Sequence, residues 1–87
     1  MTNTVYYLKC LNIDKRTNEK LSLSGYLCFP NLNQVNYFFG FLKNGFSNDG
    51  AFFYEKEQMV NVKDELYEKI NKNKQYFIKN INDYLVW

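Results

Sequence analysis

The stretch Asn31–Phe46, NLNQVNYFFGFLKNGF, has the strongest influence on how this chain is expected to fold. Five of its sixteen residues are Phe or Tyr, and its apolar side chains recur at spacings of three and four, the period of one buried helical face. Asn31 can cap the first turn, and Pro30 before it disfavours helix at Phe29. Gly45 suits the left-handed position that follows many helices. The pattern predicts a helix that begins at the Asn31 cap and ends before Gly45, with Phe46 folding back on Phe41 and with these side chains turned inward: Leu32, Val35, Phe38, Phe39 and Leu42.

Two strands are predicted before this helix. Residues Thr4–Ile13 are rich in β-branched and aromatic types, and Lys20–Phe29 alternates apolar and polar side chains with a period of two. The polar loop between them predicts an antiparallel hairpin. A register with the leucines on one buried face is expected, since a slip of one residue would bury the serines. Its pairs are Ile13 with Leu21, Leu11 with Leu23, Tyr7 with Leu27, and Val5 with Phe29.

That register places Tyr6, Leu8 and Tyr26 together on the opposite face of the hairpin. Two tyrosines flanking a leucine combine apolar rings with polar tips, which suits a protein interface better than bare solvent. We therefore expect these three residues to form a partner-binding surface. The alternative is that the last helix covers this face through its own apolar side chains, Leu66, Ile70 and Phe77.

The second half of the chain leaves two boundaries open. The stretch AFFYEKEQMVNV, residues 51–62, is a third strand or a strand followed by a bend near Lys56–Gln58. Residues 63–87 are helical by composition, either as one long helix or as two pieces broken around Asn71–Asn73, with Asn61 as the expected N-cap.

The predicted fold is a two-layer α+β domain spanning residues 1–87, in the order β-β-α-β-α, with a three-stranded antiparallel sheet packed by two helices. The face that each helix covers stays open.

Composition narrows the function classes. Eleven basic residues against nine acidic ones give a net charge of +2, which argues against a strong electrostatic footprint for nucleic acid or membrane. Histidine is absent, so a His-based triad and His metal ligands are excluded. Cys10 and Cys28 lack the basic setting that activates a thiol, and the expected register holds them on the order of 13 Å apart, too far for a disulfide. We expect no enzymatic activity, no cofactor and no metal.

The N-terminus has neither a basic region nor a long apolar core, and no run of residues is apolar enough to span a membrane. We therefore expect a cytoplasmic protein. Protein binding is the favoured function, because the supply of large apolar side chains exceeds one compact core. In size, single-domain build and lack of catalytic motifs, the chain resembles the small inhibitors made by phages and mobile elements, including anti-CRISPR proteins. This resemblance implies an inhibitor of a host defence system such as CRISPR.

The alternative function is nucleic-acid binding by the last helix. Basic side chains interleaved with aromatic ones can follow phosphates and stack bases. The residues that would do so are Lys69, Lys72, Lys74, Tyr76 and Lys79. A run of lysines on a helix is more often simply its solvated face, and the acids just upstream weaken the positive field. Protein binding therefore stays the first hypothesis.

Overall fold

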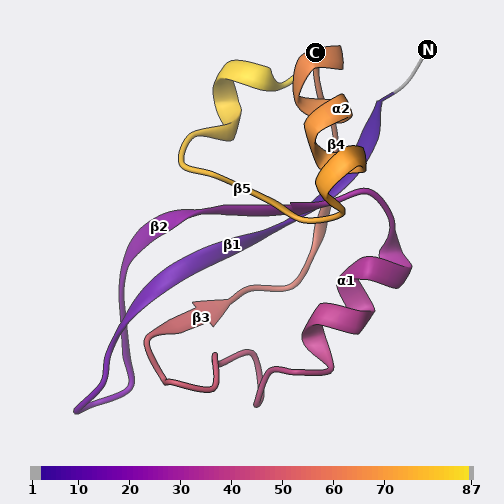
Figure 1. Ribbon diagram of the computed structural model, residues 1–87. Helices are drawn as coiled ribbons and strands as arrows, with labels where there is room; N and C mark the ends of the chain where they lie inside the picture. The colour runs from indigo at the N-terminus through magenta and orange to yellow at the C-terminus, as the bar shows by residue number, and fades with distance from the viewer. Residues whose placement is uncertain (1–2, 87) are drawn as a thin grey trace.

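A long antiparallel hairpin is the frame of the molecule, whose computed structural model describes residues 3–86 (Figure 1). Its strands are β1 (Thr4–Asp14) and β2 (Glu19–Phe29), which confirms the predicted hairpin. Three short strands extend the sheet, all antiparallel: β3 (Phe52–Tyr54) and β4 (Gln58–Asn61) pair with β1, and β5 (Tyr76–Ile78) pairs with β2. The α+β class and the antiparallel sheet are confirmed. The expected three strands are wrong, because the sheet has five.

Helix α1 (Leu32–Phe39) begins as predicted and ends early. The Asn31 side chain accepts a hydrogen bond from the Gln34 backbone N–H at 3.0 Å, which satisfies one free donor of the first turn. The helix stops at Gly40, a poor helix former, and the chain then turns so that Lys43 and Phe46 exchange backbone hydrogen bonds. The predicted continuation of the helix as far as the residue before Gly45 is therefore wrong.

Long-range packing explains that early end. The Phe46 ring lies against Phe53 of β3, with centroids 4.9 Å apart, and does not return to the helix. Gly45 does have a positive φ of 90°, but it sits in the turn beside β3, where a Cβ would collide with the Phe53 ring. Of the side chains expected to face inward, Val35 is fully buried, Phe38 and Phe39 are partly buried, and Leu32 is exposed.

The hairpin register differs from the predicted one by a residue along much of its length. Tyr6 pairs with Phe29, and Leu8 pairs with Leu27. Leu11 does face Leu23 as predicted, but the register shifts on both sides of Leu11. The prediction assumed that one face is buried and the other is wet. That assumption fails here, because apolar side chains pack against both faces, so the alternation along β2 does not determine the register.

Both faces of the hairpin are covered, which makes three layers in place of the predicted two. On one face, a cluster of Leu8, Leu27 and Phe29 packs on Val35 of α1. On the other, Val5, Tyr7 and Cys28 pack on helix α2 (Asp64–Asn73) through Leu66 and Ile70. Figure 1 shows α2 above the strands and α1 below them.

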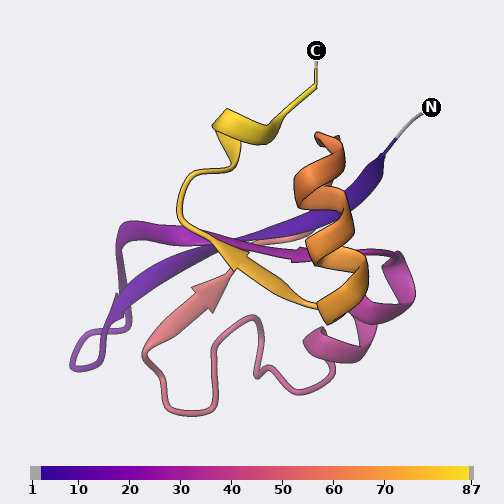
Figure 2. The same ribbon diagram turned by 45° about the horizontal axis from the view of Figure 1, so that its top comes forward.

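The chain after α1 departs from the prediction in two places. Residues 51–62 begin with a strand that ends before the expected bend, but a second strand, β4, follows that was not predicted. Helix α2 ends at Asn73, where one of the two alternatives left open placed a break, and Lys74 takes a left-handed conformation with φ 65°. The segment after Lys74 is not a second α-helix. Figure 2 shows the chain running along β2 as β5 and then turning away into a 3₁₀ helix, η1 (Ile81–Tyr84).

Pairing with a strand that is distant in the sequence explains why this segment is not helical. Tyr76, Phe77 and Ile78 favour strand, and the edge of β2 beside them is available for pairing. The N-cap of α2 is Lys63 and not the expected Asn61, which belongs to β4. No helix within residues 3–86 has the length and apolarity needed to cross a membrane.

Candidate interaction surface

The expected binding face of Tyr6, Leu8 and Tyr26 does not exist as one surface. Leu8 is 0% exposed and belongs to the cluster under α1. Tyr6 lies partly buried beside the same cluster. Tyr26 is on the opposite face, with its ring 5.3 Å from that of Tyr7. The error follows from the register. When the pairing of two strands shifts by one residue, side chains that were expected on the same face of the sheet lie on opposite faces.

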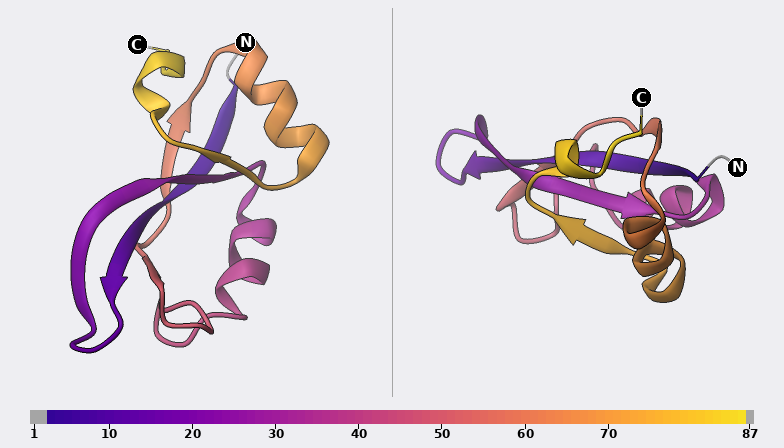
Figure 3. Two further views of the ribbon diagram at one scale, coloured as in Figure 1. Left: turned by 60° about the vertical axis from the view of Figure 1, so that its left-hand side comes forward. Right: turned by 90° about the horizontal axis from the view of Figure 1, so that it is seen from above.

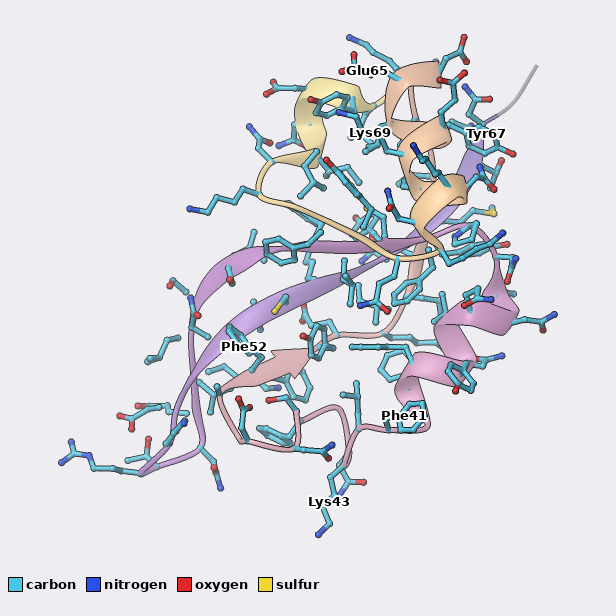
Figure 4. The ribbon with its side chains drawn as sticks, in the orientation of Figure 1. Phe41, Lys43, Phe52, Glu65, Tyr67 and Lys69 are labelled. Atoms are coloured by element: carbon cyan, nitrogen blue, oxygen red, sulfur yellow. The ribbon has the colours of Figure 1, made fainter. Side chains whose placement is uncertain are left out.

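The residues of the nucleic-acid alternative lie on and after α2, and two of them have partners within the protein. Lys69 forms an ion pair with Glu65 at 3.8 Å, and both side chains are labelled on α2 in Figure 4. The Lys69 ammonium also lies 6.0 Å from the centroid of the Tyr76 ring, which packs partly buried against the core. Lys72, Lys74 and Lys79 are exposed. Nucleic-acid binding by this set stays a prediction.

Eight large apolar side chains are exposed within residues 3–86, and three of them lie along β2. Leu21 is 55% exposed, Leu23 is 44% exposed, and Phe77 of β5 is 45% exposed. Phe77 pairs with Leu27, and its ring covers Gly25 so closely that a Cβ at Gly25 would overlap it. Glycine at position 25 therefore allows the Phe77 ring to lie over β2 on the same face as Leu27.

The backbone beside these side chains is open. β2 pairs with β1 on one side, whereas β5 covers its other side only at Tyr26–Cys28. No strand within the described residues pairs with the outer side of β2 from Glu19 to Gly25. In Figure 3 this part of β2 lies on the outside of the molecule, in a hairpin that projects away from both helices. We call Leu21, Leu23, Phe77 and the Glu19–Gly25 backbone the leucine edge.

Contacts on the inner side hold this arm of the hairpin in place. The Lys20 ammonium lies 4.0 Å from the centroid of the Phe53 ring, a cation–π contact that ties β2 to β3. The Asn12 side chain donates to the Ser22 hydroxyl at 3.2 Å. Both register shifts along β1 add a residue on the β2 side, and such bulges strengthen the local twist. A twisted edge strand does not pair indiscriminately with flat strands of other molecules. The side chains along the edge therefore determine which partner binds.

Sequence reasoning placed Leu21 and Leu23 inside, and helix length explains the error. The predicted helix, with about thirteen residues between Asn31 and Gly45, would be about 20 Å long, enough to cover more than half of a strand. The eight residues of α1 span only about 12 Å, whereas the eleven residues of β2 extend about 36 Å. The end of β2 next to the hairpin loop therefore has no helix above it. The signal in the sequence was Gly40, which marks where the helix ends.

A second exposed pair lies on α1 and its C-terminal turn. The rings of Tyr37 and Phe41 meet edge to face with centroids 5.1 Å apart, and both are largely exposed. Figure 4 places Phe41 at the lower end of α1, away from β2. This pair has apolar surface but no open strand backbone beside it.

The thiols take no part in the leucine edge. Burial raises the pKa of the Cys28 thiol to about 12, and it raises the pKa of Cys10 against an opposing hydrogen bond from Tyr54. Both side chains are buried and free, and near neutral pH both are protonated and unreactive.

Comparison with known proteins adds no relative. No protein-family model matches the chain, and no curated protein or solved structure shows significant similarity to it.

Proposed function

We propose that this chain is a non-enzymatic protein-binding module whose partner docks on the leucine edge. One observation carries the proposal: exposed leucines stand next to a length of β2 that, within the described residues, has no strand beside it. Together these supply both parts of recognition by strand addition. The open N–H and C=O groups give affinity, and the apolar side chains give specificity.

The surroundings of the edge resemble the anatomy of an interface. Leu21, Leu23 and Phe77 expose apolar side chains along this edge, and Glu19 and Lys79, both exposed, stand at its opposite ends. The edge is short, so the contact belongs to the small and transient class of interfaces, for which affinities around the micromolar range are typical. Inhibition of a host defence system such as CRISPR is a narrower version of this function, and it rests on size and composition alone.

The experiment compares three forms of the tagged protein in affinity capture from cells, with and without nuclease. These are the unaltered chain, Leu21→Ser/Leu23→Ser, and Leu32→Ser. Leu32 is 44% exposed on α1, as Leu23 is on β2, so it controls for the loss of an exposed leucine. Any protein captured is then purified and titrated against each form by calorimetry.

We expect nuclease-resistant capture of a protein by the unaltered chain and by the Leu32 variant. The double variant should bind at least about 30-fold more weakly, because an interface anchor contributes about 2 kcal/mol or more. Equal affinity of all three forms would refute the leucine edge as the site. Capture of nucleic acid alone would favour Lys69 and Lys72 of α2 and the lysines that follow this helix instead.

A further inference from the structure

The turn between α1 and β3 contains the pair of residues that allows an asparagine to modify itself. Asn44 is the one asparagine in the sequence that precedes a glycine. The next residue's backbone nitrogen can attack a side-chain amide, and glycine leaves that nitrogen most accessible because it has no Cβ. Asn44 is exposed, and within the described residues the Gly45 N–H takes no part in the backbone hydrogen bonds of the turn. Figure 4 labels Lys43 in this turn, at the end of the molecule away from α2.

The closed turn holds the two reacting groups apart. Lys43 and Phe46 exchange both backbone hydrogen bonds, at 2.9 and 3.0 Å, and Asn44 and Gly45 have φ values of 54° and 90°. These are the features of a two-residue turn of type I′. In such a turn the Asn44 Cβ and the Gly45 nitrogen lie nearly opposite one another about the Cα–C bond, whereas the five-membered ring formed by the attack needs them on the same side. The reaction therefore requires the turn to open.

We propose that Asn44 is a site of spontaneous deamidation and that opening of this turn controls its rate. The Gly45 nitrogen gives up its proton and bonds to the Asn44 Cγ, whose bond to the amide nitrogen breaks, so that ammonia leaves and a cyclic imide remains. Water then opens the imide at either carbonyl and leaves an aspartate or an isoaspartate at position 44. In sum, water is consumed and ammonia is released, with no oxidant or cofactor. The proposal is independent of the leucine edge.

Contacts with β3 hold the turn closed. The Gly45 carbonyl accepts a hydrogen bond from the Tyr54 N–H at 2.8 Å, and the Phe46 ring lies edge to face against Phe53 with centroids 4.9 Å apart. These contacts are few and lie near the surface, so the turn should open more often than the whole protein unfolds.

The two products differ in their effect on the turn. An aspartate keeps the length of the backbone and suits a type I′ turn as asparagine does. An isoaspartate adds one carbon to the main chain, so Lys43 and Phe46 can no longer exchange both hydrogen bonds, and the contact of Phe46 with Phe53 is lost. Deamidation is therefore an irreversible step that loosens the connection between α1 and β3.

Asp49 precedes Gly50 and could form the same imide, but its carboxyl is protected. The Ser47 hydroxyl donates to it at 2.7 Å and the Ala51 N–H at 3.0 Å, and these hydrogen bonds lower the pKa of the Asp49 carboxyl. An ionised carboxylate resists attack by an amide nitrogen. Asp49 should therefore stay unchanged while Asn44 converts.

Peptide mapping by mass spectrometry tests the site on the full-length chain, incubated at mildly alkaline pH both folded and in urea. Asn44 should be the first asparagine to convert in both, and at least about 10-fold more slowly in the folded protein, where the turn is closed. Asn18 is the internal control, because it is also exposed with φ 60° but is followed by Glu19. It should keep its amide while Asn44 converts.

A substitution at Phe46 tests the control by the turn. Phe46→Ala should speed the conversion of Asn44 in the folded protein at least about 5-fold, because it removes the ring contact with β3. Tyr37→Ala is the matched control, since it removes an exposed ring that contacts Phe41 and should leave the rate unchanged.

Urea melts show whether each variant is still folded, and Phe46→Leu, with a smaller expected acceleration, replaces Phe46→Ala if that variant is not. Earlier conversion of another asparagine would overturn the assignment of the site. Equal rates in urea and in the folded protein, or no acceleration in the folded Phe46 variant, would overturn the control by the turn.

Discussion

Truncating Leu8 and Leu21 to alanine, each in its own variant, measures the difference in burial between them. The sequence pattern predicts that Leu21 is buried and Leu8 is exposed, and the structure shows the reverse. Leu8 is fully buried under α1, among Leu27, Phe29 and Val35. Leu21 lies on the projecting part of β2 and is mostly exposed. The two variants remove the same atoms from neighbouring strands of one hairpin, so intrinsic strand preference largely cancels between them.

The expected losses differ because only one position can leave a cavity. Leu8→Ala loses the transfer free energy of the side chain and leaves a void between the sheet and α1, which costs about 3–5 kcal/mol at such sites. Leu21→Ala loses less than half of a transfer term with no cavity, so it should cost under about 1 kcal/mol. Since a domain of this size is stable by about 5–10 kcal/mol, the first loss is a large share of the total.

Urea denaturation followed by far-ultraviolet circular dichroism gives both free energies of unfolding, with equal slopes as the check that the same transition is compared. If Leu8→Ala leaves too little folded protein, Leu8→Val should cost about 1 kcal/mol and preserve the comparison. Equal losses at the two positions, or the larger loss at Leu21, would show that the register and the covered face are wrong.

Three further predictions concern single residues. The free energy of unfolding should fall as pH rises above about 9 and continue falling towards 12. The reason is that burial raises the pKa of Cys28 to about 12 in the folded state, so the unfolded chain releases that proton first. Cys28→Val should flatten this part of a pH series of urea melts, whereas an unchanged profile would rule out the thiol as its source. Lys74→Gly should stabilise the protein by up to about 1 kcal/mol in the same melts, because Lys74 has φ 65°, and a clear loss would mean that its conformation is not the strained one described. Gly45→Ala should cost more than Gly50→Ala, since both have positive φ but only at Gly45 would the added Cβ meet the Phe53 ring; equal costs would refute that close approach.

Local signals in the sequence predict the starts and breaks of elements well. The Asn31 cap, the hairpin and the break at Asn73 depend on a few neighbouring residues, and all are present. The acids Asp64 and Glu65 stand in the first turn of α2, where they complement the helix dipole.

Features that depend on distant contacts could not be predicted in the same way. After Gly40 the chain turns towards β3, where Phe46 packs on Phe53, and β5 is a strand because β2 offers it a partner. The register fails because helices cover both faces, and the alternation of side chains along β2 cannot reveal a second cover. The candidate site was misplaced for the same reason, since the expected surface at Leu8 became core and the expected core at Leu21 became surface.

The proposed function depends on the outer side of β2 from Glu19 to Gly25 being an unpaired strand edge with which a protein partner pairs. Amide hydrogen exchange examines this edge residue by residue, measured by NMR on the protein alone and again with any captured partner. We predict that protection rises in Glu19–Gly25 and β5 and stays unchanged around Tyr37 and Phe41. Unchanged exchange along β2, or new protection confined to α1 or to the lysines of α2, would contradict the proposal.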